Sequence, residues 1–86
     1  MKPTVKKPTQ KEQQEAKSWP IWEKEKSTFP WEYDEQETCL ILEGKASVKC
    51  PEGTVDFESG DYVIFPVGLK CTWDIKNKIR KHYKFG

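Results

Sequence analysis

Short runs of apolar residues alternate with turn signals along most of the chain after residue 18. Within most runs apolar and polar side chains alternate, and this period of two residues is typical of strands that bury one face. The pattern predicts about eight short strands, near residues 22–26, 29–33, 37–43, 46–50, 54–57, 62–65, 70–75 and 79–85. Strands and helices do not alternate, so the pattern favours an antiparallel sandwich or barrel.

Glycine-containing turns separate the predicted strands, at Glu43–Lys45, Pro51–Gly53, Ser59–Asp61 and Pro66–Gly68. Glycine adopts the backbone conformations that tight turns require. The strand at 62–65 is apolar on both faces, which indicates a position deep in the packed sheet. Closure of the sheet into a barrel would also remove the exposed edges that are a hazard in a small all-β protein.

Residues 1–18 lack this pattern, because Met1, Val5 and Ala16 are their only apolar side chains apart from prolines. Such a stretch buries too little surface to offset the entropy lost on ordering. We therefore predict a flexible basic tail over residues 1–18 and one folded domain over residues 19–86.

Charge is unevenly distributed, although the net charge is only +1. Residues 1–18 carry +3, residues 19–75 carry −7 and residues 76–86 carry +5. The basic ends could contact nucleic acid or an acidic partner, but attraction to the acidic middle of the same chain explains them more simply. Nucleic-acid binding would need a larger basic patch with stacking aromatic residues, so we do not expect it.

The length of 86 residues fits one domain, and eleven aromatic residues supply much of its buried area. No apolar run is long enough to span a bilayer, and the first 20 residues lack the apolar region of a secretory signal. Cys39, Cys50 and Cys71 are odd in number and form no CxxC pair. We expect free thiols in a reducing compartment, namely the cytoplasm or an organellar stroma.

Five ordered motifs resemble those of the cupin family. They are Trp19–Trp22, the ETCLILEG segment Glu37–Gly44, the GDYVIFPVG segment Gly60–Gly68, Trp73 and Arg80–Tyr83. The chain is most similar to the short, single-domain cupins grouped with the ureidoglycine aminohydrolase cupin domain. This resemblance implies a small double-stranded β-helix, or jelly-roll barrel, that often forms a homodimer.

The resemblance also locates where a metal-binding cupin would hold its ion. The family's histidine positions fall here on Trp31, Tyr33 and Cys71, and only the glutamate, Glu37, is retained. The single histidine, His82, lies outside the motif positions. An indole N–H is a donor only, so Trp31 cannot serve as a ligand. We predict no cofactor, with a divalent metal on Glu37, Tyr33 and Cys71 as the weaker alternative.

The resemblance and the period of two place a set of side chains inside the barrel, together with Ile41. We predict that they bind a small-molecule ligand: Trp31, Tyr33, Glu37, Cys39, Cys71 and Trp73. Aromatic walls with a few polar groups are typical of ligand pockets. The alternative is a filled core, because small barrels are commonly plugged by their own side chains.

Glu37 is the candidate catalytic residue, because a carboxylate among apolar neighbours is a candidate general acid or base. The alternative is a structural hydrogen bond to Tyr33 or to a backbone amide. Cys71 lacks a nearby base for nucleophilic catalysis, so packing is its simpler role. The basic cluster Lys76–Lys84 could bind an anion, but it is more typical of a solvated edge strand.

These observations predict a protein that binds a small polar or sugar-like molecule in its barrel, without a histidine-based metal site. A metal-dependent cupin enzyme acting on a small nitrogenous or sugar compound is the alternative. A non-catalytic interaction subunit, using a dimer surface and the charged ends, is the third. Fold alone does not decide among them.

Overall fold

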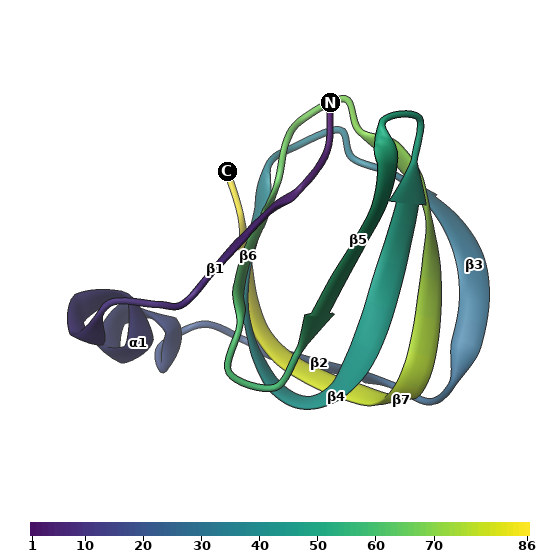
Figure 1. The fold of residues 1–86 in the computed structure, drawn as a ribbon. Coiled ribbons are helices and arrows are strands. Elements are labelled where there is room, and N and C mark those ends of the chain that lie inside the picture. The colour runs from purple at the N-terminus through teal and green to yellow at the C-terminus, as the bar shows by residue number, and fades with distance from the viewer.

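The computed structural model describes residues 1–86 and contains seven strands and one short helix (Figure 1). The bounds are β1 Thr4–Lys6, α1 Gln10–Ala16, β2 Ile21–Lys24, β3 Ser27–Glu32, β4 Glu37–Cys50, β5 Gly53–Glu58, β6 Tyr62–Phe65 and β7 Lys70–Phe85. Every strand pair is antiparallel. The predicted all-β jelly-roll class is therefore confirmed. The structure contains no helix with the length and apolar character needed to cross a membrane.

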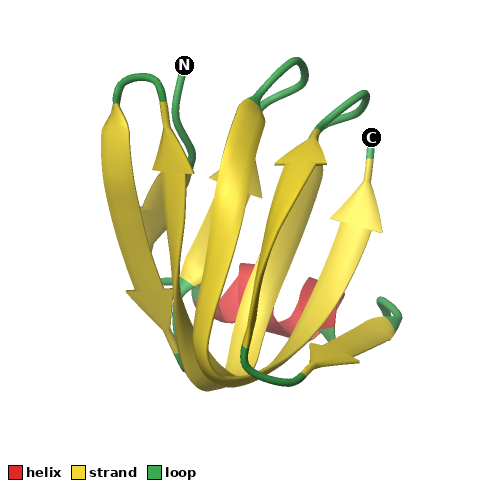
Figure 2. Ribbon diagram, turned by 90° about the vertical axis from the view of Figure 1, so that its right-hand side faces the viewer, coloured by secondary structure: helices red, strands yellow, loops and turns green.

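Two long strands, β4 and β7, organise the sheet. They pair with each other, while β4 also pairs with β5 and β6, and β7 also pairs with β2 and β3. Figure 1 shows that β4 and β7 bend along the bottom of the view, so that the sheet wraps round an interior with β3 on one side and β6 on the other. Residues far apart in sequence on β3, β4 and β7 therefore face one another across that interior. In Figure 2 the helix lies behind the strands that are nearest the viewer.

The turn expected at Glu43–Lys45 does not form, because β4 continues through it as one strand. The pairing with β7 shifts register on both sides of Gly44, whose φ of 95° lies in the left-handed region that favours glycine. Such a β-bulge bends a strand without ending it. The strands expected at 70–75 and 79–85 are likewise one strand, β7. This is why the structure has fewer and longer strands than the pattern predicts.

The amino-terminal segment contains β1 and α1, where the sequence predicts a flexible tail. Strand β1 pairs with β6. The helix begins with a capping box, in which Thr9 and Glu12 each accept a hydrogen bond from the other's backbone N–H. Its last residue, Ala16, is fully buried and packs with Leu40 and Tyr62 on the outside of the barrel. Pairing, capping and one buried methyl group thus order a segment that has no apolar stripe.

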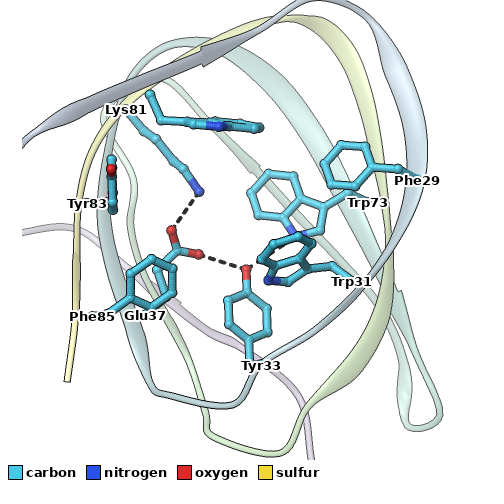
Figure 3. Close-up of a pocket in the computed structure, with 9 residues that line it drawn as sticks. Phe29, Trp31, Tyr33, Glu37, Trp73, Lys81, Tyr83 and Phe85 are labelled. Atoms are coloured by element: carbon cyan, nitrogen blue, oxygen red, sulfur yellow. Dashed lines mark hydrogen bonds and ion pairs between the residues drawn. The ribbon is translucent and has the colours of Figure 1, made fainter.

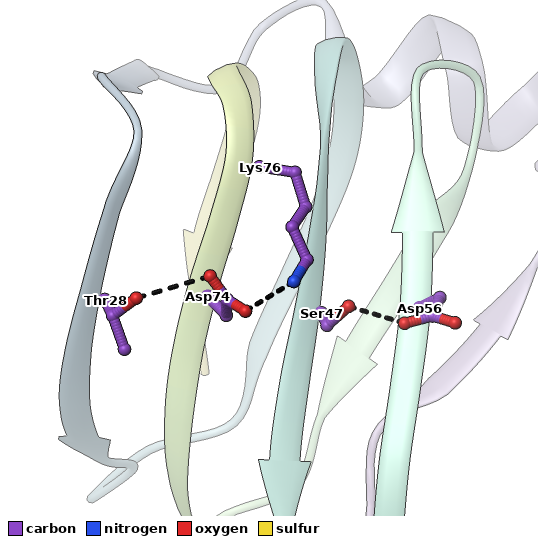
Figure 4. Close-up of polar contacts among 5 residues, drawn as sticks. All are labelled: Thr28, Ser47, Asp56, Asp74 and Lys76. Atoms are coloured by element: carbon purple, nitrogen blue, oxygen red, sulfur yellow. Dashed lines mark hydrogen bonds and ion pairs between the residues drawn. The ribbon is translucent and has the colours of Figure 1, made fainter.

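Side chains alternate between the two faces of the sheet as the period of two predicts. Figure 4 shows a row of polar residues on the outer face of β3, β7, β4 and β5, in which Thr28 and Lys76 contact Asp74, and Ser47 contacts Asp56. The hydrogen bond from Lys76 lowers the pKa of Asp74. Successive side chains of a strand point to opposite faces, so the residues next to this polar row point into the barrel.

The interior is dominated by aromatic rings that pack around Trp73. Its ring centroid lies 5.3 Å from those of Phe57 and Phe65, and the Phe29 ring stacks on it at 6.1 Å. Aromatic pairs in this range add stabilisation beyond their buried area. Phe57 and Phe65 lie in the filled part of the core. Trp73 and Phe29 also face a space that no side chain fills.

Candidate functional site

A cavity of about 210 Å³ lies inside the barrel. Nine side chains from β2, β3, β4, β7 and the loop after β3 line it: Trp22, Phe29, Trp31, Tyr33, Glu37, Trp73, Lys81, Tyr83 and Phe85 (Figure 3). Seven of them are aromatic, and the two others carry opposite charges. The cavity therefore has aromatic walls that contain one ion pair.

Strand periodicity positions most of these side chains. On β7, Lys81, Tyr83 and Phe85 follow one another at every second residue, so they enter the cavity from one face of one strand. Phe29 and Trp31 do the same on β3. Tyr33 lies just beyond β3, where its backbone N–H donates to the Leu69 carbonyl at 2.9 Å. This bond holds the loop against the start of β7.

The charged pair lies deep in the wall, with each side chain only 5% exposed. Lys81 Nζ donates to Glu37 Oε2 at 2.9 Å, and the Tyr33 hydroxyl donates to Glu37 Oε1 at 2.7 Å. Trp73 Nε1 in turn donates to the Tyr33 hydroxyl oxygen at 3.3 Å. Glu37 is thus satisfied on both oxygens, and the structural hydrogen bond to Tyr33 considered in the sequence analysis is present.

The Lys81 ammonium faces aromatic rings as well as Glu37. Its Nζ lies 4.6 Å from the Trp73 ring centroid and 4.8 Å from that of Trp22, distances at which a cation is attracted to a ring face. An ammonium has three N–H donors, and Glu37 is its one hydrogen-bond acceptor in the protein. Lys81 therefore retains donors for an oxygen atom that enters the cavity.

Burial changes the acid–base properties of two groups beside the pair. Burial, followed by the charge of Glu37, raises the pKa of Tyr33 far above its usual value, so the phenol stays protonated and acts as a donor. Burial also raises the pKa of Cys39 well above its usual value. Cys39 is therefore a thiol that packs in the core.

The structure brings together four of the six predicted ligand residues, Trp31, Tyr33, Glu37 and Trp73, around the cavity. It does not bring Cys39 or Cys71 there. Cys39 is fully buried, and Cys71 lines a separate shallow hollow. Burial, with smaller contributions from neighbouring charges, raises the pKa of Cys71 to about 11, which disfavours the thiolate that nucleophilic catalysis requires.

Five residues that line the cavity were not predicted from the sequence: Trp22, Phe29, Lys81, Tyr83 and Phe85. The solvated edge strand favoured for Lys76–Lys84 is wrong, because β7 pairs with both β2 and β4 at Arg80–His82 and Lys81 is buried. The signal was available: Lys81 lies between Ile79 and Tyr83 at every second residue of one face. A single lysine on an otherwise apolar face predicts a buried ammonium that needs a carboxylate.

The residues at the family's metal positions do not suit the divalent metal that the resemblance implies. Both oxygens of Glu37 are already held, one by an ammonium that would repel a second cation. Cys71 directs its S–H toward the Trp31 carbonyl and lines the other hollow. No three His, Cys, Asp or Glu side chains cluster as metal ligands would.

A family model and a solved structure each match most of this chain. The family model described as the EutQ-like cupin domain matches residues 11–83. A DUF861 family protein from Thermotoga maritima is 46% identical, with a TM-score of 0.92 over 98% of this chain and 99% of that one. The similarity therefore includes the amino-terminal segment and the whole barrel.

More distant structures share the fold alone. A putative ethanolamine utilization protein Q from Salmonella typhimurium is 23% identical over 76% of this chain and 53% of its own, with a TM-score of 0.69. The EutQ protein of Clostridium difficile is 22% identical over 76% of this chain and 52% of its own, with a TM-score of 0.70. This chain thus spans about half of either protein. No curated protein sequence matches.

Proposed function

Because the chain belongs to the EutQ-like cupin domain family, we propose that it binds a small, neutral, sugar-like molecule in the cavity of its barrel. The observation that carries this proposal is the combination of aromatic walls with one buried ion pair that keeps unused hydrogen-bond donors. Apolar walls with a few convergent polar groups are typical of small-molecule sites.

Cavity size limits the ligand. The volume of about 210 Å³ is below the roughly 300–1,000 Å³ usual for drug-sized ligands. A molecule with a single ring fits this limit. The flat indole and phenyl rings of the wall suit the apolar C–H faces of a sugar-like ring, while its hydroxyl groups reach toward the ion pair.

Charge indicates a neutral ligand. Glu37 and Lys81 compensate each other in the wall of the cavity, so a neutral polyol enters without leaving a buried charge unpaired. A hydroxyl group can accept a hydrogen bond from Lys81 and donate one to Glu37, which uses both partners at once. An anion would instead place a second negative charge beside Glu37, and a cation would meet the Lys81 ammonium.

The test is isothermal titration calorimetry with neutral probes, namely D-xylose, D-glucose and myo-inositol, with ethanolamine as a cationic probe. We expect at least one neutral probe to bind and ethanolamine to give no heat of binding. Thermal unfolding with the same probes provides a second readout, because a ligand specific for the folded state raises its melting temperature. Absence of binding by all neutral probes at millimolar concentration would contradict the proposal.

The matched variants are Trp31→Ala and Val67→Ala. Both residues are exposed, at 49% and 56%, but only Trp31 lines the cavity. We expect Trp31→Ala to weaken binding at least tenfold with little change in melting temperature, since it removes a wall of the site and not a core side chain. Val67→Ala should leave binding unchanged. Equal effects of the two variants would place the ligand elsewhere.

A further inference from the structure

The second hollow contains two of the three free cysteines and shares no lining residue with the aromatic cavity. It is lined by the end of β4, the turn that follows and the start of β7: Lys49, Cys50, Pro51, Lys70, Cys71 and Thr72. Nothing in the proposed ligand site uses these thiols.

Strand register places the two thiols opposite each other. On β4 and β7, Val48 pairs with Trp73 and Lys49 pairs with Thr72. One further step along this register sets Cys50 against Cys71. Val48 and Trp73 are both buried in the interior, and residues two positions away share their face. Both cysteines therefore project from the same side of the sheet.

The backbone separation suits a covalent bridge. Residues directly opposite in an antiparallel pair have Cα atoms about 4.5–5.5 Å apart. Disulfides join residues whose Cα atoms lie about 4.4–6.8 Å apart. Neither thiol has a strong competing partner, because Cys50 Sγ donates to the Gly53 carbonyl at 3.1 Å and Cys71 Sγ to the Trp31 carbonyl at 3.6 Å. A thiol is a weak donor, so these bonds give way easily.

The two thiols differ in accessibility, which assigns them different roles. Cys50 is half-buried, whereas Cys71 is only 8% exposed. Burial, and after it the neighbouring Cys50, raises the pKa of Cys71 to about 11. Cys71 is thus poorly suited to react first with a reagent from solution. Cys39 is fully buried and has Tyr83, not a cysteine, as its partner on β7.

We propose that Cys50 and Cys71 form a peroxide-reactive dithiol site, in which Cys50 is oxidised first and Cys71 then closes an intramolecular disulfide. In the first step the Cys50 sulfur attacks a hydroperoxide oxygen and the O–O bond breaks. The alcohol leaves with a proton, and Cys50 becomes a sulfenic acid. In the second step the Cys71 sulfur attacks the Cys50 sulfur, the S–O bond breaks and water leaves. Two thiols are oxidised by two electrons, and the hydroperoxide is reduced to an alcohol and water.

The experiment uses the reduced full-length protein and tert-butyl hydroperoxide in small excess. Free thiols are counted after denaturation, and the protein is then digested without reduction for peptide mapping by mass spectrometry. We expect two of the three thiols to disappear together and one cross-linked peptide pair to join Cys50 to Cys71. Dithiothreitol should restore both thiols. This measurement needs no variant, so a folding defect cannot obscure it.

Three variants separate the roles. Cys71→Ala should leave a sulfenic acid on Cys50 that dimedone traps, Cys50→Ala should abolish rapid thiol loss, and the control Cys39→Ala should leave the cross-link intact. Cross-links between chains only, or oxidation of Cys50 to a sulfinic acid in the unmodified chain without a bridge to Cys71, would overturn the proposal.

Discussion

Replacing Lys81 by methionine tests whether the buried ion pair is as isolated from water as the structure indicates. The substitution keeps a long, flexible side chain but removes the only cation that contacts Glu37. The Glu37 carboxylate would then lie among aromatic rings with only the Tyr33 hydroxyl as a partner. Removing one partner of a buried pair costs about 3–5 kcal/mol, because the other charge remains buried.

This cost is a large part of the roughly 5–15 kcal/mol that stabilises a small domain. In a chain of this length, each kcal/mol corresponds to about 4–8 °C in melting temperature. We therefore expect Lys81→Met to lower the melting temperature by at least about 10 °C. Circular dichroism during thermal and urea unfolding measures the change.

A matched control lies three residues earlier on the same strand. Lys78 is exposed and pairs with the exposed Glu25 at 3.9 Å, and such surface pairs contribute about 0–1 kcal/mol. Lys78→Met should therefore change the melting temperature by only a few degrees. The double variant Glu37→Gln/Lys81→Met removes both charges and should be more stable than Lys81→Met alone. If Lys81→Met costs no more than Lys78→Met, the pair is solvated and the reasoning fails.

Three further predictions concern the frame around the site. Thr9→Ala removes the side-chain half of the capping box and should cost about 1 kcal/mol in urea unfolding, because it leaves a helix N–H unpaired. Gly44→Ala should destabilise the fold by more than about 1 kcal/mol in the same assay, since the positive φ disfavours alanine and its Cβ would meet the Lys78 carbonyl. Folding raises the pKa of Cys71 from 9.0 to about 11. The unfolded chain therefore loses the thiol proton at lower pH than the folded chain, and the free energy of unfolding should fall as pH rises from about 9 to 11. Cys71→Ala should reduce that fall in urea unfolding measured at each pH, and an unchanged pH profile would refute this assignment.

Much of the fold follows from the sequence because the period of two persists in most strands. The alternation that predicts a strand at 54–57 is observed in β5, and the continuous apolar run at 62–65 forms β6. Local signals misled at Gly44, where glycine serves a β-bulge instead of a turn, because both uses require the same positive φ. Only the pairing with β7, a contact distant in sequence, distinguishes the two.

Contacts between residues distant in sequence also explain why the order of the amino-terminal segment and about half of the cavity lining could not be predicted. The order of α1 depends on Ala16 meeting Leu40 and Tyr62, which no pattern within residues 1–18 reveals. Trp22 and Phe29 face the cavity only because β2 and β3 both pair with β7. Glu37 could be singled out, since it is a lone carboxylate on an apolar strand. Its partner Lys81 lies 44 residues further along the chain. Lys81 could have been found in the same way, as a lone lysine on an apolar strand face.

Strand β7 has a consequence for how the protein is made. It supplies partners to β2, β3 and β4, yet all three precede it in the chain. On a ribosome these strands emerge while the strand that joins them has still to be synthesised. The nascent chain can therefore pair β4 with β5 and β6, but β2 and β3 remain unpaired until β7 has been synthesised. Folding of the barrel is consequently a late event, and premature termination within β7 would yield a chain with exposed strand edges that chaperones and proteases recognise.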